Sequence, residues 1–421
     1  MKGSLRLLLK LVQLILLFSL LFSYAMFQGG FVSWFLLYAF IPILIYLLTV
    51  MLYPLRTWNV SRNLSKDITR AGKDIEVTII LERKLWIPLP YLIIEDCYNA
   101  SLQETYQSKH NLARLTESKE LNKNRQFKRV VFPMFKRKLH FTYKLTDLPR
   151  GEHQFQAVRI KTGDFFGFVT KSYIFECVNR IVVYPQEKGI SMKKEQNSFE
   201  EGVAPVYSLR SKNEHVVTGV REYMSGDRFS WIDWKSSARK QMIMTKQFEQ
   251  EKTTDVFFIL DACDKKELNQ AAFETNVELV NSFVTLFENK VSNIGLLGLG
   301  LKNVYFSPQQ VGAEKRLLHH YLATVQPDGD KAFADQLVEQ IKRMPINLVV
   351  ILFLTDLNQG IITALKQVQQ RNKHVTLFLT KSSKDLSEED QRMIQQLRVI
   401  GMMVNVCTEE VMKQDQIEVS M

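Results

Sequence analysis

Residues 11–27 read LVQLILLFSLLFSYAMF and residues 31–53 read FVSWFLLYAFIPILIYLLTVMLY, with no charged side chain in either stretch. As α-helices they would extend about 25 Å and about 35 Å, which is enough to cross the hydrocarbon core of a bilayer. Only Gln28, Gly29 and Gly30 separate them. We therefore predict that residues 1–58 form a helical hairpin of two membrane spans.

The basic residues around this hairpin predict its orientation. Three precede the first stretch and two follow the second, namely Lys2, Arg6, Lys10, Arg56 and Arg62. Because basic residues flanking membrane spans stay in the cytoplasm, we predict a multi-pass protein of the cell membrane with most of its chain cytoplasmic. A cleaved signal peptide with a weak site at residues 23–25 is the alternative. The second stretch would then still retain the remainder in the cytoplasm.

The charge of the chain is concentrated in two places. Its 421 residues carry 55 Lys and Arg against 44 Asp and Glu, a net charge of +11. The first 53 residues contribute +3 and residues 123–138 contribute +7, so the remainder is close to neutral. A polyanionic partner such as nucleic acid is therefore not expected. With 46% hydrophobic residues the chain is not disordered, and four scattered cysteines fit a reducing compartment.

Residues 60–185 have the pattern of a β domain. Residues 75–81 and 139–145 alternate between apolar and polar side chains, which is typical of half-buried strands. Turn signals at Arg150-Gly151 and at residues 162–164 separate further apolar runs. Short strands at this spacing predict an immunoglobulin-like sandwich.

A basic segment lies inside this domain and allows three interpretations. Its phenylalanines could face the core of a solvated hairpin, or its charges could rest on an anionic membrane surface. Aromatic and basic side chains could also bind nucleic acid, which we favour least. The residues predicted to contact the membrane surface are Lys123, Arg125, Lys128, Arg129, Lys136, Arg137 and Lys138.

Residues 253–421 have the pattern of an α/β domain. Strand-like runs at 256–260, 294–299, 348–354, 375–379 and 403–406 alternate with helical stretches at 264–289, 313–324, 332–343, 360–370 and 388–397. The first of these helices would begin with a capping box of Asp264 and Glu267. This alternation predicts a mostly parallel, doubly wound sheet.

Acidic residues follow two of these strands, where ligands bind in such sheets. The arrangement is similar to the divalent-cation site of von Willebrand factor A domains, which holds D-x-S-x-S after the first strand. Cys263 and Lys265 replace the two serines, and a thiol and an ammonium are poor ligands for Mg²⁺. We therefore expect no cofactor, or at most Mg²⁺ at a degenerate site. If no ion binds there, Asp264 caps a helix and Asp356 is an acidic residue of a loop. The candidate ligands are Asp261, Thr355 and Asp356.

Residues 186–252 link the two domains and contain a distinctive motif with two tryptophans among acids and bases. Such a mixture indicates either an ion-pair network that docks the segment or a functional surface. The motif resembles the signature of the domain of unknown function 58 family of bacterial membrane proteins, although Ser230 stands where many members have Arg. The matching residues that we predict to bind a partner are Arg221, Tyr223, Gly226, Asp227, Asp233, Trp234, Lys235 and Arg239.

This resemblance implies a fold and a function. The implied chain has two membrane spans, a β domain and a von Willebrand factor A-like domain. Family members are associated with AAA+ ATPases of the MoxR type, so the resemblance implies a membrane-anchored adaptor or scaffold for assembly or maturation of other proteins. Its partners would be that ATPase, other membrane proteins and membrane lipids, and it would have no catalysis of its own.

Two other functions compete with the adaptor. The first is a structural envelope protein whose β domain rests on the membrane surface. The second is a metal-dependent nuclease, because Asp233-Trp234-Lys235 has the form D-x-K found in such enzymes. That form is very common by chance, and we favour it least.

Overall fold

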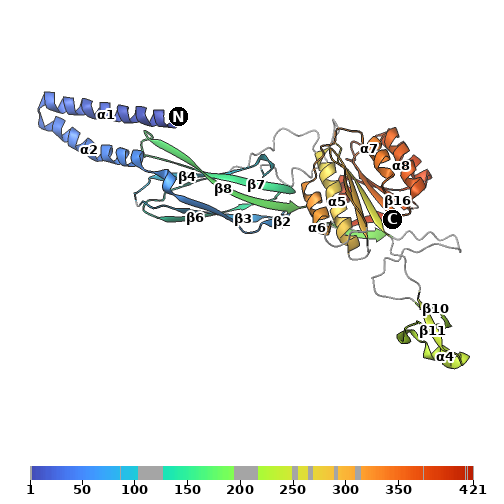
Figure 1. Cartoon of the computed structure of the whole chain (residues 1–421). Coiled ribbons are helices and arrows are strands. Elements are labelled where there is room, and N and C mark those ends of the chain that lie inside the picture. Colours follow the sequence, from blue (N-terminus) through green and yellow to red (C-terminus); the bar gives the residue numbers. More distant parts are fainter. Residues whose placement is uncertain are drawn as a thin grey trace. The chain divides into compact units, whose positions relative to one another are not determined.

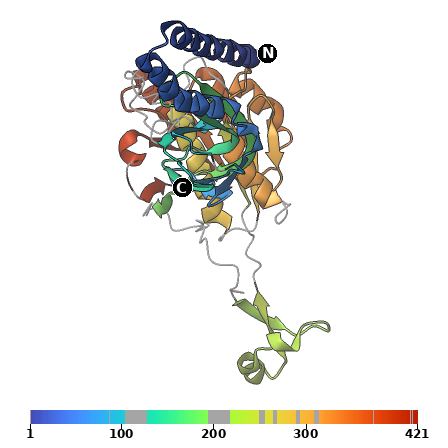
Figure 2. The same ribbon diagram turned by 90° about the vertical axis from the view of Figure 1, so that its left-hand side faces the viewer.

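The computed structural model describes the chain except residues 1, 86, 103–126, 194–216, 249–254, 264–268, 289–292, 309–313, 373, 413, 415 and 421. The described residues divide into two compact units, one up to Tyr184 and one from Pro185 onward. Figures 1 and 2 show the elements of both units from two directions.

The first unit begins with two helices, α1 (Lys2–Gln28) and α2 (Phe31–Leu52), joined through Gly29 at a φ of +60°. Residues Leu9–Gln28 of α1 and the whole of α2 are long and apolar enough to cross a membrane, in agreement with the two stretches found in the sequence. Pro42 lies inside α2, where a membrane helix tolerates it.

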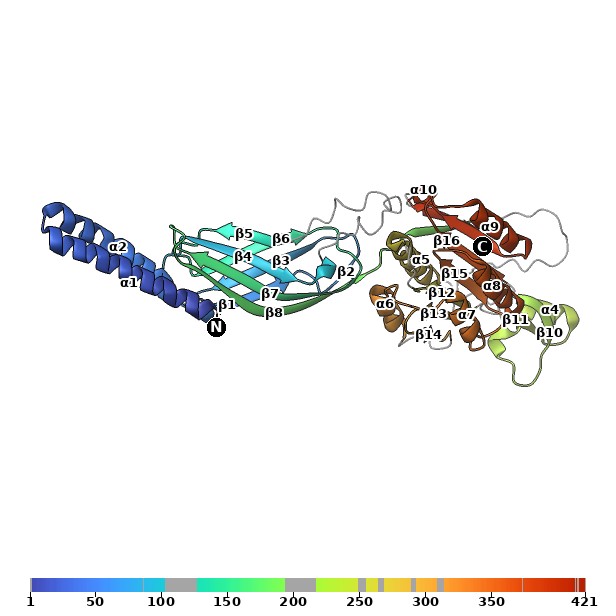
Figure 3. The ribbon, with the colours of Figure 1, turned by 90° about the horizontal axis from the view of Figure 1, so that it is seen from above.

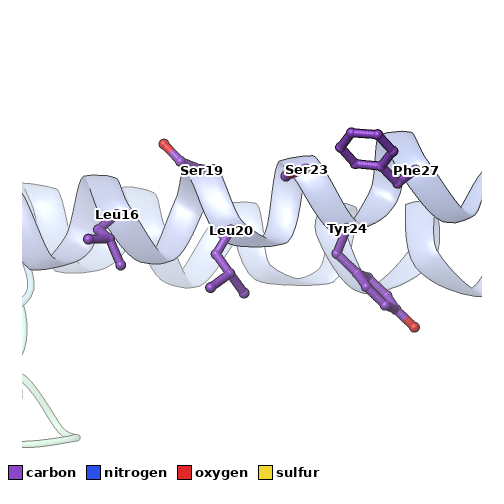
Figure 4. A pocket seen from close by; sticks show the side chains of 6 residues that line it. All are labelled: Leu16, Ser19, Leu20, Ser23, Tyr24 and Phe27. Carbon is purple, nitrogen blue, oxygen red and sulfur yellow. The ribbon is translucent and has the colours of Figure 1, made fainter.

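A shallow hollow runs along the exposed side of α1, and Figure 4 shows the side chains around it. Most of its lining is apolar. Such an open apolar helix face is suited to contact with acyl chains. The lining residues are Leu16, Ser19, Leu20, Ser23, Tyr24 and Phe27.

Two sheets follow the helices in the first unit. One is antiparallel and has three strands in the order β1 (Asn59–Leu64), β3 (Ile75–Glu82), β6 (Lys138–Leu145). The other has the order β2 (Ile68–Arg70), β8 (Thr170–Tyr184), β7 (Gly151–Gly163), β4 (Tyr91–Tyr98), β5 (Phe127–Val131). Only the β2–β8 pair of this sheet is parallel. Two short 3₁₀ turns, Leu55–Thr57 and Ala100–Leu102, accompany the strands.

Alternate side chains of these strands are buried, as the period-two patterns predict. The buried set includes an ion pair, because Arg62 donates to both carboxylate oxygens of Asp96 with no exposed side-chain surface on either residue. Tyr143 also donates to Asp96, at 2.6 Å. Burial raises the pKa of Asp96 even though Arg62 opposes it. A buried charge is tolerated here because its partners satisfy it.

The strand registers place several turns at one end of the two sheets, where the chain leaves α2 and begins β1, and we call this the helix end. Asn59 of β1 pairs with Glu82, and Glu82 pairs with Lys138 at the start of β6. In the other sheet, Leu92 of β4 lies between Val131, the last residue of β5, and Thr162 near the end of β7. The turns β5–β6 and β7–β8 therefore both lie at the helix end (Figures 1 and 3).

The second unit contains a six-stranded sheet with strand order β14 (Val304–Phe306), β13 (Ile294–Leu299), β12 (Val256–Asp261), β15 (Val349–Leu354), β16 (His374–Thr380), β17 (Met403–Cys407). All neighbours are parallel except β13 and β14. The mostly parallel sheet predicted from the sequence is confirmed, and the antiparallel edge strand β14 was not anticipated.

Helices cover this sheet (Figure 3), and the buried apolar side chains beneath them form two separate clusters. One cluster includes α5 (Gln270–Glu288) and α6 (Glu314–Thr324), and the other includes α7 (Phe333–Ile341), α8 (Gln359–Arg371) and α9 (Glu388–Val399). A last short helix is α10 (Glu409–Met412). Helix α5 begins after Asn269, whose side chain accepts from the backbone N–H of Ala271 and Ala272. The expected capping box at Asp264 and Glu267 lies outside the described residues.

Part of the predicted linker belongs to the α/β unit. Strand β9 (Gly189–Lys193) pairs in parallel with β18 (Gln416–Ser420), and Ile417 and Val419 are buried in the cluster that contains α5. The backbone N–H of Lys188 also donates to Ser282 Oγ at 2.9 Å. The sequence did not predict these strands because each is only five residues long and they lie more than two hundred residues apart.

Candidate functional site

The motif in the linker folds into a small body that we call the signature module, residues 217–248. Strand β10 (Val217–Glu222) pairs antiparallel with β11 (Met244–Phe248), with Arg221 opposite Thr245. Between them lie a 3₁₀ turn, Phe229–Trp231, and helix α4 (Trp234–Lys240). Figure 2 shows this hairpin and its helix in yellow-green.

Asp227 closes the turn that follows β10. Its carboxylate accepts from Arg221 Nη2 at 2.6 Å and from the backbone N–H of Met224 at 3.0 Å. The first of these bonds is the main reason that the pKa of Asp227 is lowered. Gly226 has a φ of +114°, a backbone conformation that side-chain-bearing residues rarely adopt. These residues therefore hold the backbone of the module.

Asp233 positions helix α4. Its side chain accepts from the N–H of Ser236 at 3.0 Å as the N-cap, and this bond lowers the pKa of Asp233. Ser237 Oγ donates to the Asp233 carbonyl at 2.7 Å and accepts from the N–H of Met244 at 2.9 Å. Helix α4 is thereby tied to β11. The aspartate of the D-x-K pattern caps a helix, while Lys235 is exposed.

The module leaves an apolar and basic surface uncovered. Trp234 is 71% exposed, and Arg228 lies over the Trp231 ring at 5.5 Å. Lys235 and Arg239 on α4 are also exposed. We call the following residues the signature surface: Met224, Phe229, Trp231, Trp234, Lys235, Arg239, Met242 and Ile243.

The eight residues selected from the motif therefore have different surroundings. Arg221, Gly226, Asp227 and Asp233 shape the backbone of the module. The half-buried Tyr223 ring lies 6.2 Å from that of Phe229, so it lies next to the exposed residues. Trp234, Lys235 and Arg239 are exposed on α4. The sequence predicted the segment but did not show which of its residues hold the backbone and which are exposed.

The candidate metal ligands lie at the carboxyl edge of the six-stranded sheet. The strand order reverses between β12 and β15, which is where ligands bind in doubly wound sheets. Asp261 ends β12 and accepts from the N–H of Cys263 at 3.1 Å. Thr355 and Asp356 follow β15. Thr355 Oγ1 is buried and has no hydrogen-bond partner in the part of the chain that the structure describes.

A lysine supplies positive charge at this edge. Lys381 Nζ donates to Asp356 at 3.2 Å and to Asp390 at 2.8 Å. Burial lowers the pKa of Lys381, but the bonds to these carboxylates outweigh it, so the pKa is raised overall. The thiol of Cys263 points to the Leu299 carbonyl, at 3.6 Å.

These surroundings do not fit a hard divalent cation well, because an ammonium group already neutralises Asp356 and the thiol is a poor ligand. Among the residues described, no three or more His, Cys, Asp and Glu side chains group as metal ligands would. Asp264 and Lys265 of the predicted pattern lie outside those residues.

Comparison with known proteins identifies the family. The sequence profile described as "Protein of unknown function DUF58" matches residues 219–388, which include the signature module from Gly219 onward and most of the α/β unit. The chain is also 39% identical to the uncharacterized protein YeaD of Bacillus subtilis over 315 residues, 74% of this chain and 73% of that protein. The chain belongs to the DUF58 family.

Similarity of the DUF58 chain to solved structures is remote. The PilB minor pilin of Streptococcus sanguinis is 8% identical with a TM-score of 0.27, covering 78% of this chain and 85% of that one. The CARDB domain of the PF1109 protein of Pyrococcus furiosus is 11% identical with a TM-score of 0.20, covering 31% of this chain and 94% of that one. These values are too low to support an argument about fold or function.

The basic segment of this DUF58 chain supplies the β5–β6 turn. Lys128 and Arg129 lie on β5, Lys136 and Arg137 lie in the turn, and Lys138 begins β6. All five side chains are exposed, and Lys138 pairs with Glu82 at 2.7 Å. Lys123 and Arg125 lie outside the described residues.

The phenylalanines of this segment do not all face the core. The Phe127 ring stacks on Tyr143 with 3.8 Å between ring centroids, but Phe132 and Phe135 are exposed. Buried Arg83 fixes the turn by donating to the carbonyls of Met134 and Lys136. The turn therefore presents aromatic and basic side chains together at the helix end.

One feature of the helix end had no functional prediction from the sequence. The β7–β8 turn carries Phe165, Phe166 and Phe168, all exposed, around the buried Asp164. From the sequence, residues 162–164 were predicted only as a turn. A cluster of aromatic residues in a predicted turn was the signal that could have identified it.

Proposed function

We propose that the chain is a membrane-anchored adaptor that binds a MoxR-type AAA+ ATPase through the signature surface, without catalysis of its own. Membership of the DUF58 family and the two apolar helices support this proposal. In it, α1 and α2 span the cell membrane and the rest of the chain is cytoplasmic. The ATPase would act on other membrane proteins that the adaptor presents.

The exposure of Trp234, Lys235 and Arg239 on the same short helix carries the proposal. Tryptophan and arginine are the residues most enriched among side chains that dominate binding energy at protein interfaces. An apolar surface of this kind on so small a module indicates an interaction site. Meanwhile Arg221, Asp227 and Asp233 hold the backbone, so the exposed side chains can contact a partner without distorting the module.

We also propose a fold type for each of the two domains. The facing sheets of the first unit suggest an immunoglobulin-like sandwich. The strand order of the second unit, with its antiparallel edge strand, suggests a von Willebrand factor A type. In this proposal Lys381 supplies the positive charge at the sheet edge that a metal ion provides elsewhere.

The test is affinity purification of the full-length chain from solubilised membranes, with and without ATP. The ATPase should co-purify with the wild-type chain and not with a Trp234→Ala/Arg239→Ala variant. An Ile346→Ala variant, which removes an exposed apolar side chain of the α/β unit, should keep it. Equal recovery of the ATPase with all three would reject the proposed surface.

A structural envelope role is the second candidate, and the helix end of the sandwich favours it. Exposed Phe132 and Phe135 beside Lys136 and Arg137 suit a membrane surface. A Lys136→Gln/Arg137→Gln variant would then cause the same envelope defect as loss of the protein while still binding the ATPase. If it restored a normal envelope, this role would be rejected.

A further inference from the structure

The β7–β8 turn combines exposed aromatic side chains with a closed backbone. Phe165 is 71% exposed, Phe166 59% and Phe168 56%. Three exposed phenylalanines within four residues form a concentrated apolar tip, which a surface facing only water would not be expected to keep.

Each backbone N–H group of residues 165–169 donates to an acceptor in the turn or on α2. The carboxylate of Asp164, itself 1% exposed, accepts from Phe166 at 2.9 Å, from Phe168 at 3.2 Å and from Val169. The N–H of Gly167 donates to the Asp164 carbonyl at 3.4 Å. The remaining N–H, of Phe165, donates to Tyr46 Oη at 3.3 Å. A turn can enter a bilayer only if its backbone donors are satisfied in this way.

The turn lies against α2. The rings of Tyr46 and Phe165 stack with 6.3 Å between centroids, and Val50 and Met51 of α2 cluster with Val169. Lys171 Nζ also donates to the Tyr53 carbonyl at 2.8 Å. These contacts run along the last two turns of α2, so they fix how far the tip extends beside the helix.

The position of Tyr46 gives the depth of the tip. Tyr46 lies six residues before Leu52, the last residue of α2, which corresponds to about 9 Å along the helix axis. Elements that lie at the boundary of headgroups and acyl chains bury their apolar side by roughly 5–10 Å. If α2 spans the membrane, the tip therefore reaches this boundary.

We propose that residues 165–168 insert into the leaflet from which α2 emerges, as an additional membrane contact besides the two helices. The occupant around the three phenylalanines is the lipid bilayer. The exposed Lys136 and Arg137 lie at the same end of the sandwich and complement anionic headgroups. This inference rests on the membrane anchor of the proposed function. It adds that the β domain is held against the bilayer and does not hang freely from α2.

The experiment places a fluorophore at single cysteines in the full-length chain. Cys97 and Cys177 are replaced by alanine, while Cys263 and Cys407 are buried and remain. The labelled variants are Phe166→Cys at the tip, Leu36→Cys on the exposed side of α2, and Ile68→Cys. Ile68 is an exposed apolar residue near the opposite end of the sandwich, because its partner Val182 pairs with Glu152 at the start of β7.

Each variant is reconstituted in vesicles of phosphatidylcholine and phosphatidylglycerol. Spin-labelled lipids report acyl-chain contact, and iodide reports water. The label at 166 should lose fluorescence with lipids spin-labelled near the carbonyl end of the chain and resist iodide. The label at 68 should respond to iodide only.

The controls separate this inference from the anchor. If position 36 is quenched by lipid but position 166 behaves like position 68, the anchor stands and the insertion of the turn is wrong. If position 166 resists iodide without lipid quenching, protein covers the tip, which also overturns the inference. If position 36 is not quenched, the membrane anchor itself fails.

Discussion

Arg221 and Asp227 form an ion pair across the turn that opens the signature module, with 2.6 Å between Arg221 Nη2 and Asp227 Oδ1. Both residues were selected from the sequence as partner-binding residues. In the structure they act on the backbone of the module, whereas Trp234 nearby in the sequence is exposed. The motif thus combines residues that hold the backbone of the module with residues whose exposed side chains form its surface.

This pair predicts an unusually acidic Asp227. Because its pKa is lowered below the ordinary 3.8, the pair stabilises the module above that pH and is lost as the pH falls through the lowered value. A carboxyl carbon titration by NMR should give a midpoint below 3.8 for the wild type. In an Arg221→Gln variant the midpoint should rise toward the ordinary value. An unchanged midpoint in the variant would show that Arg221 is not the cause.

Asp164 should control the order of the β7–β8 turn. An Asp164→Ala variant removes the acceptor of three backbone N–H groups, and losing a hydrogen bond to a charged group costs roughly 1.5–3 kcal/mol. Exchange of the backbone amide hydrogens of Phe166, Phe168 and Val169 should therefore be faster in Asp164→Ala than in the wild type. Asp74→Ala is the control, since Asp74 accepts one exposed N–H, from Asp147. Exchange at residues 166–169 that is equal in both variants would contradict this role.

Lys381 should stabilise the carboxyl edge of the α/β sheet. A Lys381→Met variant leaves Asp356 and Asp390 without their ammonium partner and should lose roughly 1.5–3 kcal/mol of unfolding free energy. The pKa of Lys381 is raised, so its contribution is complete below pH 10.5 and is lost as the pH rises through the raised value.

Urea unfolding of the full-length chain at neutral pH and above pH 10.5 tests this prediction, with the exposed Lys384→Met as control. The difference in unfolding free energy between Lys381→Met and the wild type should be smaller above pH 10.5 than at neutral pH. The ion pairs would be contradicted if the loss of unfolding free energy in Lys381→Met did not depend on pH. They would also be contradicted if Lys384→Met lost as much.

Strand β18 should be an integral part of the α/β unit. Ile417 is 1% exposed within the cluster that contains α5, so Ile417→Ala should destabilise the unit by roughly 2–5 kcal/mol. The neighbouring exposed Gln416→Ala should have little effect. Thermal unfolding of the full-length chain measures both. Equal unfolding temperatures for the two variants would mean that β9 and β18 are not packed as described.

The sequence predicted the regular elements well where burial is continuous. Residues 294–299 were predicted as a strand and form β13 with the same bounds, because a parallel strand covered on both faces is an unbroken apolar run. Strands β9 and β18 were missed because short strands depend on distant partners for their stability. The edge strand β14 was missed because three residues are too few to show a strand pattern, although its partner β13 directly precedes it in the chain.

The sequence predicted the candidate sites only as segments. It located Asp261 and Asp356 at strand ends, but the approach of Lys381 depends on how β15 and β16 align. It likewise located the basic segment, but not that Arg83 fixes this turn or that Phe127 is half-buried whereas Phe132 is exposed. Such contacts join residues far apart in sequence, so local patterns do not contain them.

The most direct test of the proposed adaptor role is the affinity of the nanodisc-embedded full-length chain for the purified MoxR-type ATPase. The Trp234→Ala variant should raise Kd about thirtyfold, as expected for loss of roughly 2 kcal/mol at an interface hot spot. Ile346→Ala should leave Kd unchanged, and NMR should show an intact signature module in Trp234→Ala. If a folded Trp234→Ala/Arg239→Ala variant binds as tightly as the wild type, or if the wild type does not bind, the account is contradicted.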